Sequence, residues 1–183
     1  MCVFVFGFSN FIPKFQQFKS FLRNMQKSEN LTPGQAWIKI QKYCAYQERC
    51  HAEVKEKLYS YGLYPNDVEQ LTTRLIEENF LNEERFAKAF AGGKFRTKKW
   101  GRVKIKLELK ARKISDYCIR QGMKEIDNVL YFEQMKKIMD KRWEEMRKEK
   151  NMGLRKHKTS SYLIAKGYEP DIVWDYLREL AAG

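Results

Sequence analysis

The hydrophobic positions of this chain recur mostly at spacings of three and four residues, as they do on the buried face of an amphipathic helix. One stretch has a leucine, a glycine four positions later, then a proline and a valine at intervals of three. Such a glycine is suited to end one helix, and such a proline fits the first turn of the next. The spacing occurs in full twice, with a degenerate copy between, at Leu58, Gly62, Pro65 and Val68, at Leu109, Lys113, Asp116 and Ile119, and at Leu163, Gly167, Pro170 and Val173.

The leucines of the three copies lie 51 and 54 residues apart, and a fixed period of this kind is typical of repeat proteins. We therefore predict an all-α fold of three tandem three-helix repeats that form an elongated, curved array. The expected repeats span residues 36–80, 81–124 and 125–183, and the second of them is strongly basic.

Residues 1–35 are expected to lie outside this array, as a Phe-rich N-terminal extension followed by a linker at residues 26–35. The uncharged stretch before Lys14 is too short to span a bilayer, which takes about 20 apolar residues. An interfacial helix is the alternative for this segment. We expect no contact with a membrane, and Met25 is a candidate translation start.

Glycines and capping residues mark the expected ends of several helices. The first repeat is expected to open at Ala36, and Gly153 is expected to separate two helices of the third repeat. Asn82 and Ser115 are good N-caps, because their side-chain oxygens can accept a hydrogen bond from the first turn. A bend is expected at Gly92–Gly93.

The stretch 102–113 allows two local interpretations. Its apolar residues alternate with polar ones, which by itself is a strand pattern. The repeat spacing places the same stretch on a helix, and we favour the helix for that reason. A helix would gather four cations along one sector, namely Arg102, Lys106, Lys110 and Lys113.

Charge is the strongest local signal. The 183-residue chain has a formal net charge of +13, which suits an anionic partner such as nucleic acid, a membrane surface or an acidic protein. We call residues 94–113 the basic run, because only one acid, Glu108, lies among its cations. These cations are Lys94, Arg96, Lys98, Lys99, Arg102, Lys104, Lys106, Lys110, Arg112 and Lys113. A second basic cluster consists of Arg155, Lys156, Lys158 and Lys166.

Both basic segments are candidates for binding phosphates, which gives affinity without sequence preference. Trp100 interrupts the basic run and could stack on an exposed base. The alternative is a solvated helix face with Trp100 packed in the core. If the repeats stack side by side, the basic run and the second basic cluster could line one concave surface.

Motifs for catalysis and metal binding are missing from the sequence. Gly93-Lys94 lacks the rest of a phosphate-binding loop, and the sequence has neither a nucleophile elbow nor a zinc-protease motif. The cysteines form no Cys-x2-Cys pair, and the two histidines lie far apart, so we expect no metal. We predict a protein that is not an enzyme, uses no cofactor and keeps reduced thiols in the cytoplasm.

The second predicted repeat contains a distinctive series of motifs, namely Phe80-Leu81-Asn82-Glu83-Glu84-Arg85-Phe86-Ala87, followed by Trp100-Gly101, Ile105, Glu108-Leu109 and Ile114-Ser115. This series resembles the RecX family of RecA regulators, and the resemblance extends over about residues 36–180. Lys166-Gly167-Tyr168 resembles a turn of the family's last repeat. Two positions depart from the family pattern, because Lys113 replaces the usual glycine and Ser161 replaces a basic residue.

The resemblance implies a cytoplasmic, monomeric modulator of RecA in DNA repair, recombination and the SOS response. Family members are tandem three-helix repeats that lie in the groove of the RecA–DNA filament. They inhibit strand exchange, ATP hydrolysis and repressor cleavage. The expected partners are RecA, its filament and single- or double-stranded DNA, with Arg102, Lys106 and Lys110 as the first contacts to consider. Two alternatives remain, a nucleic-acid-binding protein without a RecA partner and an adaptor whose charge serves only solubility.

Overall fold

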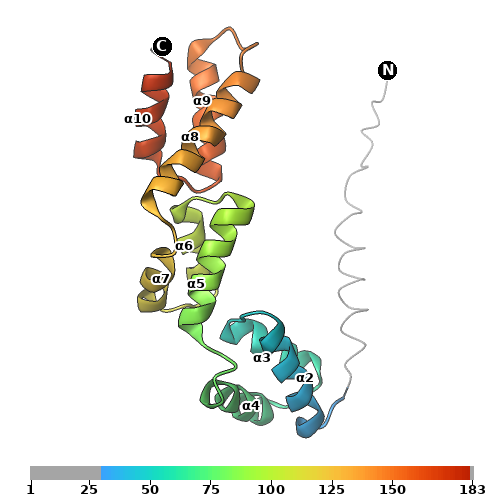
Figure 1. Ribbon diagram of the computed structural model, residues 1–183. Helices are drawn as coiled ribbons and strands as arrows, with labels where there is room; N and C mark the ends of the chain where they lie inside the picture. The colour runs from blue at the N-terminus through green and yellow to red at the C-terminus, as the bar shows by residue number, and fades with distance from the viewer. Residues whose placement is uncertain (1–29, 182–183) are drawn as a thin grey trace, which may run out of the picture.

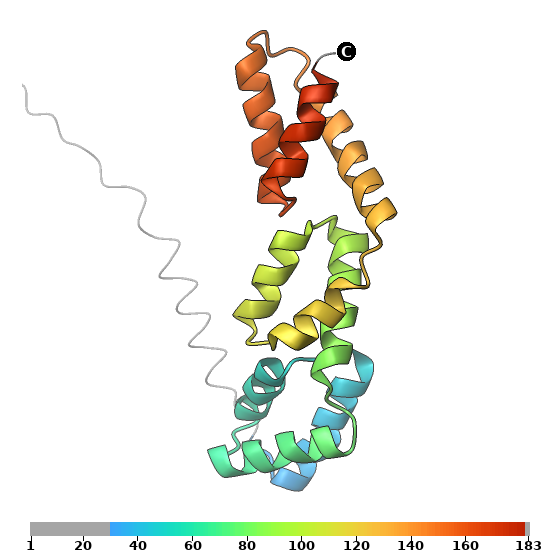
Figure 2. The ribbon, with the colours of Figure 1, turned by 90° about the vertical axis from the view of Figure 1, so that its left-hand side faces the viewer.

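A computed structural model describes residues 30–181, which form nine α-helices, a short π-helix and no strand (Figure 1). The helices are arranged in three successive groups of three along an elongated, curved molecule (Figure 2). The predicted all-α repeat array is therefore confirmed. The Phe-rich segment and Met25 lie outside the described residues.

Each repeat contributes three consecutive helices. The first repeat comprises α2 (Pro33–Tyr46), α3 (His51–Ser60) and α4 (Pro65–Glu77). The second comprises α5 (Glu83–Gly93), the π-helix η1 (Lys94–Lys98), α6 (Arg102–Ala111) and α7 (Asp116–Met123). The third comprises α8 (Asn128–Glu145), α9 (Met152–Ala165) and α10 (Pro170–Leu180).

The repeated spacing has one structural meaning in all three copies. Its leucines are fully buried at the ends of α3, α6 and α9. The residue four positions later has a positive φ in each copy, 79° at Gly62, 59° at Lys113 and 91° at Gly167. This left-handed residue reverses the chain so that the third helix of each repeat can begin. Lys113 adopts the same conformation despite its side chain, which costs energy that a glycine avoids.

The helix predicted over 102–113 is confirmed by α6, whose buried residues are Ile105 and Leu109. The alternation of Val103 and Leu107 with these two residues is not a strand signal. Both residues are exposed on the opposite face of the same helix.

Two predicted helix boundaries are wrong. The first helix begins at Pro33, not at Ala36, because Thr32 and Gln35 form a reciprocal capping box within the predicted linker. Gly153 lies inside α9, whose N-cap is Asn151, with its side chain accepting a hydrogen bond from the backbone N–H of Leu154 at 3.0 Å. In both cases a capping side chain, which satisfies an otherwise unpaired N–H, sets the boundary.

The hydrophobic core has two parts. The first repeat has its own cluster, which includes Ile40, Leu58 and Leu75. The second and third repeats share one continuous cluster, into which Cys50 of the first repeat also packs. The array is therefore a two-repeat block with the first repeat joined to it at one end.

Candidate nucleic-acid interface

The basic run begins in an unusual piece of helix. α5 ends at Gly93, where a bend was expected, and continues as the five-residue π-helix η1. A Cβ at Gly92 would lie 2.8 Å from a guanidinium nitrogen of Arg96, so this glycine leaves room for the Arg96 side chain. η1 ends at Lys99, whose φ of 57° turns the chain toward α6. π-helical turns are rare and often occur at functional sites.

Trp100 is half-buried against the core that the second and third repeats share. Two ammonium groups lie near its ring, those of Lys94 at 5.3 Å and Lys104 at 4.7 Å from the centroid. Base stacking by Trp100 stays a prediction, and a stacked base would have to share the ring with these cations.

The joint between the second and third repeats is built from backbone. The N–H of Gly101 donates to the carbonyl of Lys166 at 2.9 Å, and that of Val103 donates to the carbonyl of Gly167 at 3.0 Å. A Cβ at Gly101 would lie 2.1 Å from the Gly167 oxygen. The start of α6 thus satisfies its unpaired N–H groups with carbonyls from the end of α9, and this close approach requires glycine.

Arg102 belongs to this joint. Its guanidinium lies 4.0 Å from the centroid of the buried Tyr131 ring and donates to Asn128 at 2.5 Å. The Tyr131 hydroxyl accepts the Arg102 N–H at 3.3 Å and donates to the Glu169 carboxylate. Burial raises the pKa of Tyr131 well above its ordinary value, and the bond to Glu169 raises it further. Arg102 is therefore a structural residue as well as a candidate contact.

Tyr168 closes the same joint beside Tyr131, with the two ring centroids 5.2 Å apart. Its hydroxyl donates to the carbonyl of Lys99 at 3.4 Å and accepts from the Gln134 amide at 3.1 Å. Burial raises the pKa of Tyr168. These contacts fix the loop that follows η1, so the backbone of the basic run is held in place by the third repeat.

Several cations of the basic run have partners within the chain. The Lys104 ammonium lies 3.5 Å from the Ala165 carbonyl, and that of Lys110 lies 3.7 Å from the Asp116 carboxylate. Arg112 forms a 2.6 Å ion pair with Glu108. The exposed cations for which the described residues provide no ion pair are Arg96, Lys98, Lys99, Lys106 and Lys113.

The second basic cluster is divided between the two ends of α9. Lys166 lies next to Gly101 at the joint. At the other end, Arg155 donates to the Trp143 carbonyl at 2.8 Å, and Lys158 forms a 2.7 Å ion pair with Glu149. Lys156, half-buried, lies on the same turn. Only Lys166 therefore lies beside the basic run.

A groove brings part of the predicted sector together with cations that the sequence analysis missed. Arg102 and Lys106 of α6 face Arg120 and Lys124, which lie at the end of α7, and the groove has a volume of about 490 Å³. We call this the α6–α7 groove; its remaining lining residues are Met123, Ile126, Asp127 and Asn128. The four-residue spacing of Arg120 and Lys124 was visible in the sequence, but their proximity to α6 depends on the fold.

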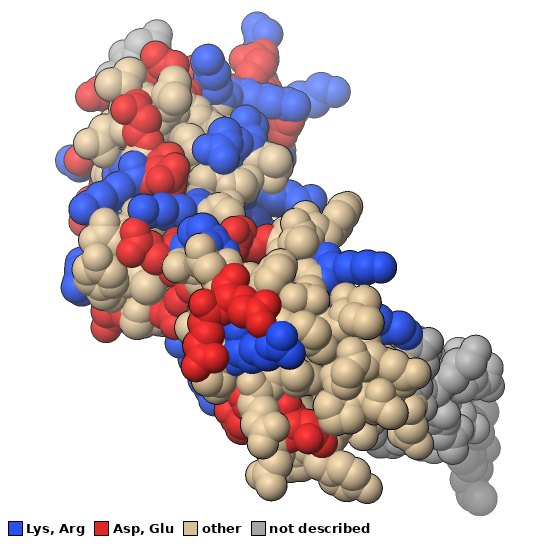
Figure 3. All heavy atoms as spheres, turned by 60° about the horizontal axis from the view of Figure 1, so that its bottom comes forward, with Lys and Arg blue, Asp and Glu red and all other residues tan. Residues whose placement is uncertain are grey.

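A smaller pocket of about 220 Å³ includes Arg96, Lys99 and Lys137. Leu130, Glu133 and Gln134 of α8 also line it. On the face shown in Figure 3, Lys and Arg side chains are spread among acidic ones and form no single continuous patch. On this face the cations therefore form no uniform positive surface, and the basic residues named above line two separate hollows.

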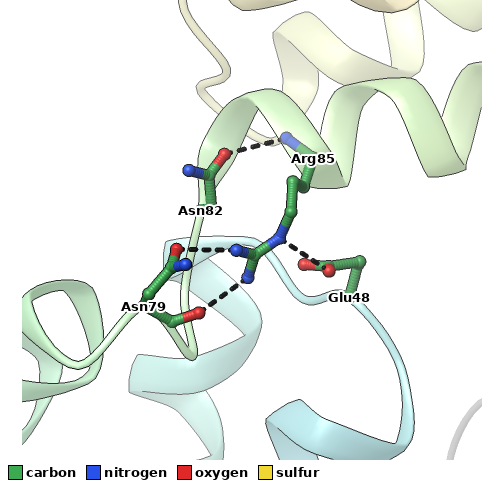
Figure 4. Close-up of polar contacts among 4 residues, drawn as sticks. All are labelled: Glu48, Asn79, Asn82 and Arg85. Atoms are coloured by element: carbon green, nitrogen blue, oxygen red, sulfur yellow. Dashed lines mark hydrogen bonds and ion pairs between the residues drawn. The ribbon is translucent and has the colours of Figure 1, made fainter.

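The first repeat joins the second through polar contacts (Figure 4). Arg85 of α5 forms a 2.9 Å ion pair with Glu48 and donates to the side chain and carbonyl of Asn79 at 2.6 and 2.8 Å. Asn82 caps the helix that carries Arg85, accepting its N–H at 2.9 Å as predicted. This arrangement sets the direction in which the first repeat leaves the two-repeat block.

Glu83 strengthens the second repeat beside this joint. Its carboxylate accepts the N–H of Ser115 at 2.7 Å, while the Ser115 side chain caps α7 as predicted. Burial would raise the pKa of Glu83, but hydrogen bonds from Ser115 and Cys118 outweigh it and lower the pKa below the usual range.

Residues 30–181 contain neither a candidate metal site nor a membrane-spanning helix. No group of three or more His, Cys, Asp or Glu side chains there could hold a metal ion. None of the helices in this range is long and apolar enough to cross a membrane.

Comparisons with known proteins agree with this architecture. The family model described as "RecX, second three-helix domain" matches residues 82–123. The regulatory protein RecX of Clostridium acetobutylicum is 28% identical over 131 residues, which cover 70% of this chain and 60% of that protein. For regulatory protein RecX of Streptococcus uberis the identity is 25%, covering 72% and 50%. The matches thus span between half and three-fifths of the length of these relatives.

Solved structures show the same fold. A crystal structure of RecX from Lactobacillus salivarius superposes with a TM-score of 0.70 at 21% identity, covering 82% of this chain and 96% of that one. A second RecX crystal structure gives a TM-score of 0.71 at 17% identity, covering 93% and 79%. The matched domain, the relatives and the fold agree with the motif resemblance: residues 82–123 match a RecX domain, and the chain is similar to RecX proteins over most of its length.

Proposed function

We propose that this protein binds the RecA–DNA filament and regulates RecA, mainly by inhibiting its recombinase, ATPase and coprotease activities. The observation that carries the proposal is that the matched RecX domain, residues 82–123, is also the repeat that contains the basic run. The family likeness and the candidate interface thus coincide in the central repeat of the array.

The shape and charge of the molecule support this proposal. Three repeats in a line present a long surface, as extended partners require. A formal net charge of +13 favours association with a polyanion, and most of the exposed cations of the basic run lack an ion pair within the described chain. A filament that contains DNA offers both length and negative charge.

The α6–α7 groove favours a second candidate, a sequence-independent nucleic-acid-binding protein that ignores RecA. Its four cations would contact phosphates whether or not RecA is bound. The two functions differ in stoichiometry, because a filament regulator acts at few sites whereas a competitor for DNA has to saturate it.

The test is the DNA-dependent ATPase activity of RecA from the same organism. Filaments are formed on single-stranded DNA that is kept in excess, and the protein is then added at substoichiometric amounts. We expect a progressive loss of ATP hydrolysis. If the activity falls only when the protein saturates the DNA, competition for phosphates explains the effect and the regulator function is rejected.

A further inference from the structure

We propose that the α6–α7 groove binds the phosphodiester backbone of nucleic acid, and that Arg120 and Lys124 are contact residues there. The assignment deepens the proposed function and rests on it for the expectation that the polymer is DNA. Neither residue belongs to the basic run, and both come from the third helix of the repeat and its C-terminal cap.

The groove has an excess of positive charge that the chain itself does not neutralise. Arg102, Lys106, Arg120 and Lys124 line it, and Asp127 is the one acid among its lining residues. The Asp127 carboxylate is already engaged, because it accepts the Leu130 N–H at 2.9 Å as the N-cap of α8.

The neighbouring cations of the same repeat behave differently. Lys88, Lys110 and Arg112 each form an ion pair with a carboxylate. Lys106, Arg120 and Lys124 are exposed and form no such pair with any described residue. Cations that lack a partner within the chain are available to form ion pairs with an external anion.

The cations are arranged as two helical pairs. Arg102 and Lys106 lie four residues apart on α6, and Arg120 and Lys124 lie four residues apart across the end of α7. Residues at this spacing share one side of a helix, so each pair presents two donors to the groove. The start of α8, at Asn128, forms the remaining rim and adds the positive end of a helix dipole.

The lining chemistry selects the backbone of a nucleic acid over its bases. The groove is lined by the four cations, by the apolar residues Met123 and Ile126, and by the polar residues Asp127 and Asn128. It includes no aromatic side chain on which a base could stack. The nearby ring of Tyr131 is buried, and Arg102 lies over it. Contacts of this kind position a polymer without reading its sequence.

Binding here is also connected to the joint between repeats. Arg102 lines the groove and at the same time contacts Tyr131 and Asn128. For that reason Arg102 is a poor residue for a test, since its replacement would disturb the joint. Arg120 and Lys124 make no such structural contact among the described residues, so we expect their replacement to leave the joint intact.

The experiment compares the double variant Arg120→Gln/Lys124→Gln with the control variant Lys141→Gln/Lys148→Gln. Both variants lose two positive charges, so they have the same net charge. The control residues are exposed, lie outside the groove and form no ion pair among residues 30–181. Binding of the full chain to a fluorescent oligothymidylate is followed by anisotropy at several salt concentrations. Thermal unfolding of all three proteins verifies that they are folded.

We expect the groove variant to bind roughly tenfold more weakly at moderate salt, and its salt dependence to fall by about 1.4 in the log–log slope, because two phosphate contacts are lost. The control should keep most of the affinity and of the slope. Equal losses in both variants would mean that net charge alone attracts DNA, and the groove assignment would be wrong.

The RecA assay separates this inference from the proposed function. If the groove variant keeps full DNA binding but no longer inhibits RecA, the groove contacts an acidic protein surface, and the nucleic-acid assignment is overturned while the regulator function stands. If the wild-type protein does not inhibit RecA, yet the groove variant loses DNA affinity as expected, the regulator function fails and the groove assignment holds.

Discussion

Thr159→Val should stabilise the protein, because Thr159 is a hydroxyl residue at a core position. Its side chain is fully buried in α9, and its hydroxyl has no hydrogen-bond partner in the described structure. The repeat spacing aligns it with Val54 of α3 and Ile105 of α6, both fully buried and apolar. Two repeats thus place a hydrocarbon where the third places an unsatisfied hydroxyl.

The magnitude follows from the desolvation of that hydroxyl. Leaving a buried polar group unpaired costs about 1–3 kcal/mol. Valine has nearly the same shape as threonine and would bury one more methyl group in place of the oxygen, worth about 0.8 kcal/mol. Allowing for partial relaxation of the site, we expect a gain of about 1–2 kcal/mol in the free energy of unfolding, or about 2–8 °C in Tm for a chain of this size.

The assay is urea denaturation at neutral pH, supported by thermal unfolding. Thr72→Val is the matched control, because Thr72 is also buried but its hydroxyl donates to the Val68 carbonyl at 2.7 Å. That variant should gain nothing or lose up to about 1 kcal/mol. If Thr159→Val is neutral or destabilising, or if the two variants gain equally, the hydroxyl of Thr159 is not an unpaired group and the reasoning is refuted.

Three further predictions concern the turns and joints. Lys113→Gly should raise the free energy of unfolding by about 0.5–1 kcal/mol in denaturant titrations, because φ is 59° there, whereas Lys113→Ala should bring no gain. Gly101→Ala should cost about 2–3 kcal/mol and lower Tm, because its Cβ would lie 2.1 Å from the Gly167 oxygen; an unchanged Tm would mean that the joint can open at no cost. Glu83→Gln should reduce the loss of stability below about pH 4.5, because a lowered carboxyl pKa contributes stability that disappears as pH falls, and unfolding measured between pH 6 and pH 3 should therefore be less steep for the variant.

The repeat architecture could be predicted because it depends on short-range spacing. The leucine, the left-handed residue and the helix start that follow one another in each copy lie within eleven residues, so the sequence alone reveals them. Lys113 shows that the spacing was more informative than the residue type, since it takes a positive φ at the position of the two glycines. The same spacing resolved the local ambiguity of residues 102–113 in favour of a helix.

The candidate site was harder to predict because its contacts are long-range. Arg102 was predicted as a phosphate contact from its helical sector, but its contacts with Asn128 and Tyr131 cross into the third repeat. Arg120 and Lys124 line the groove only because α7 folds back beside α6. The wrong prediction at Gly153 has a local cause, because the side chain of Asn151, two residues earlier, caps α9.

The proposed regulator acts on the RecA filament and not on DNA alone. The most direct measurement is its binding constant for preformed RecA filaments, held in a slowly hydrolysed nucleotide, compared with that for the same bare single-stranded DNA at the same salt concentration. We expect tighter binding to the filament and a shallower salt dependence, because RecA surface adds to the phosphate contacts. Equal or weaker binding to the filament would contradict it.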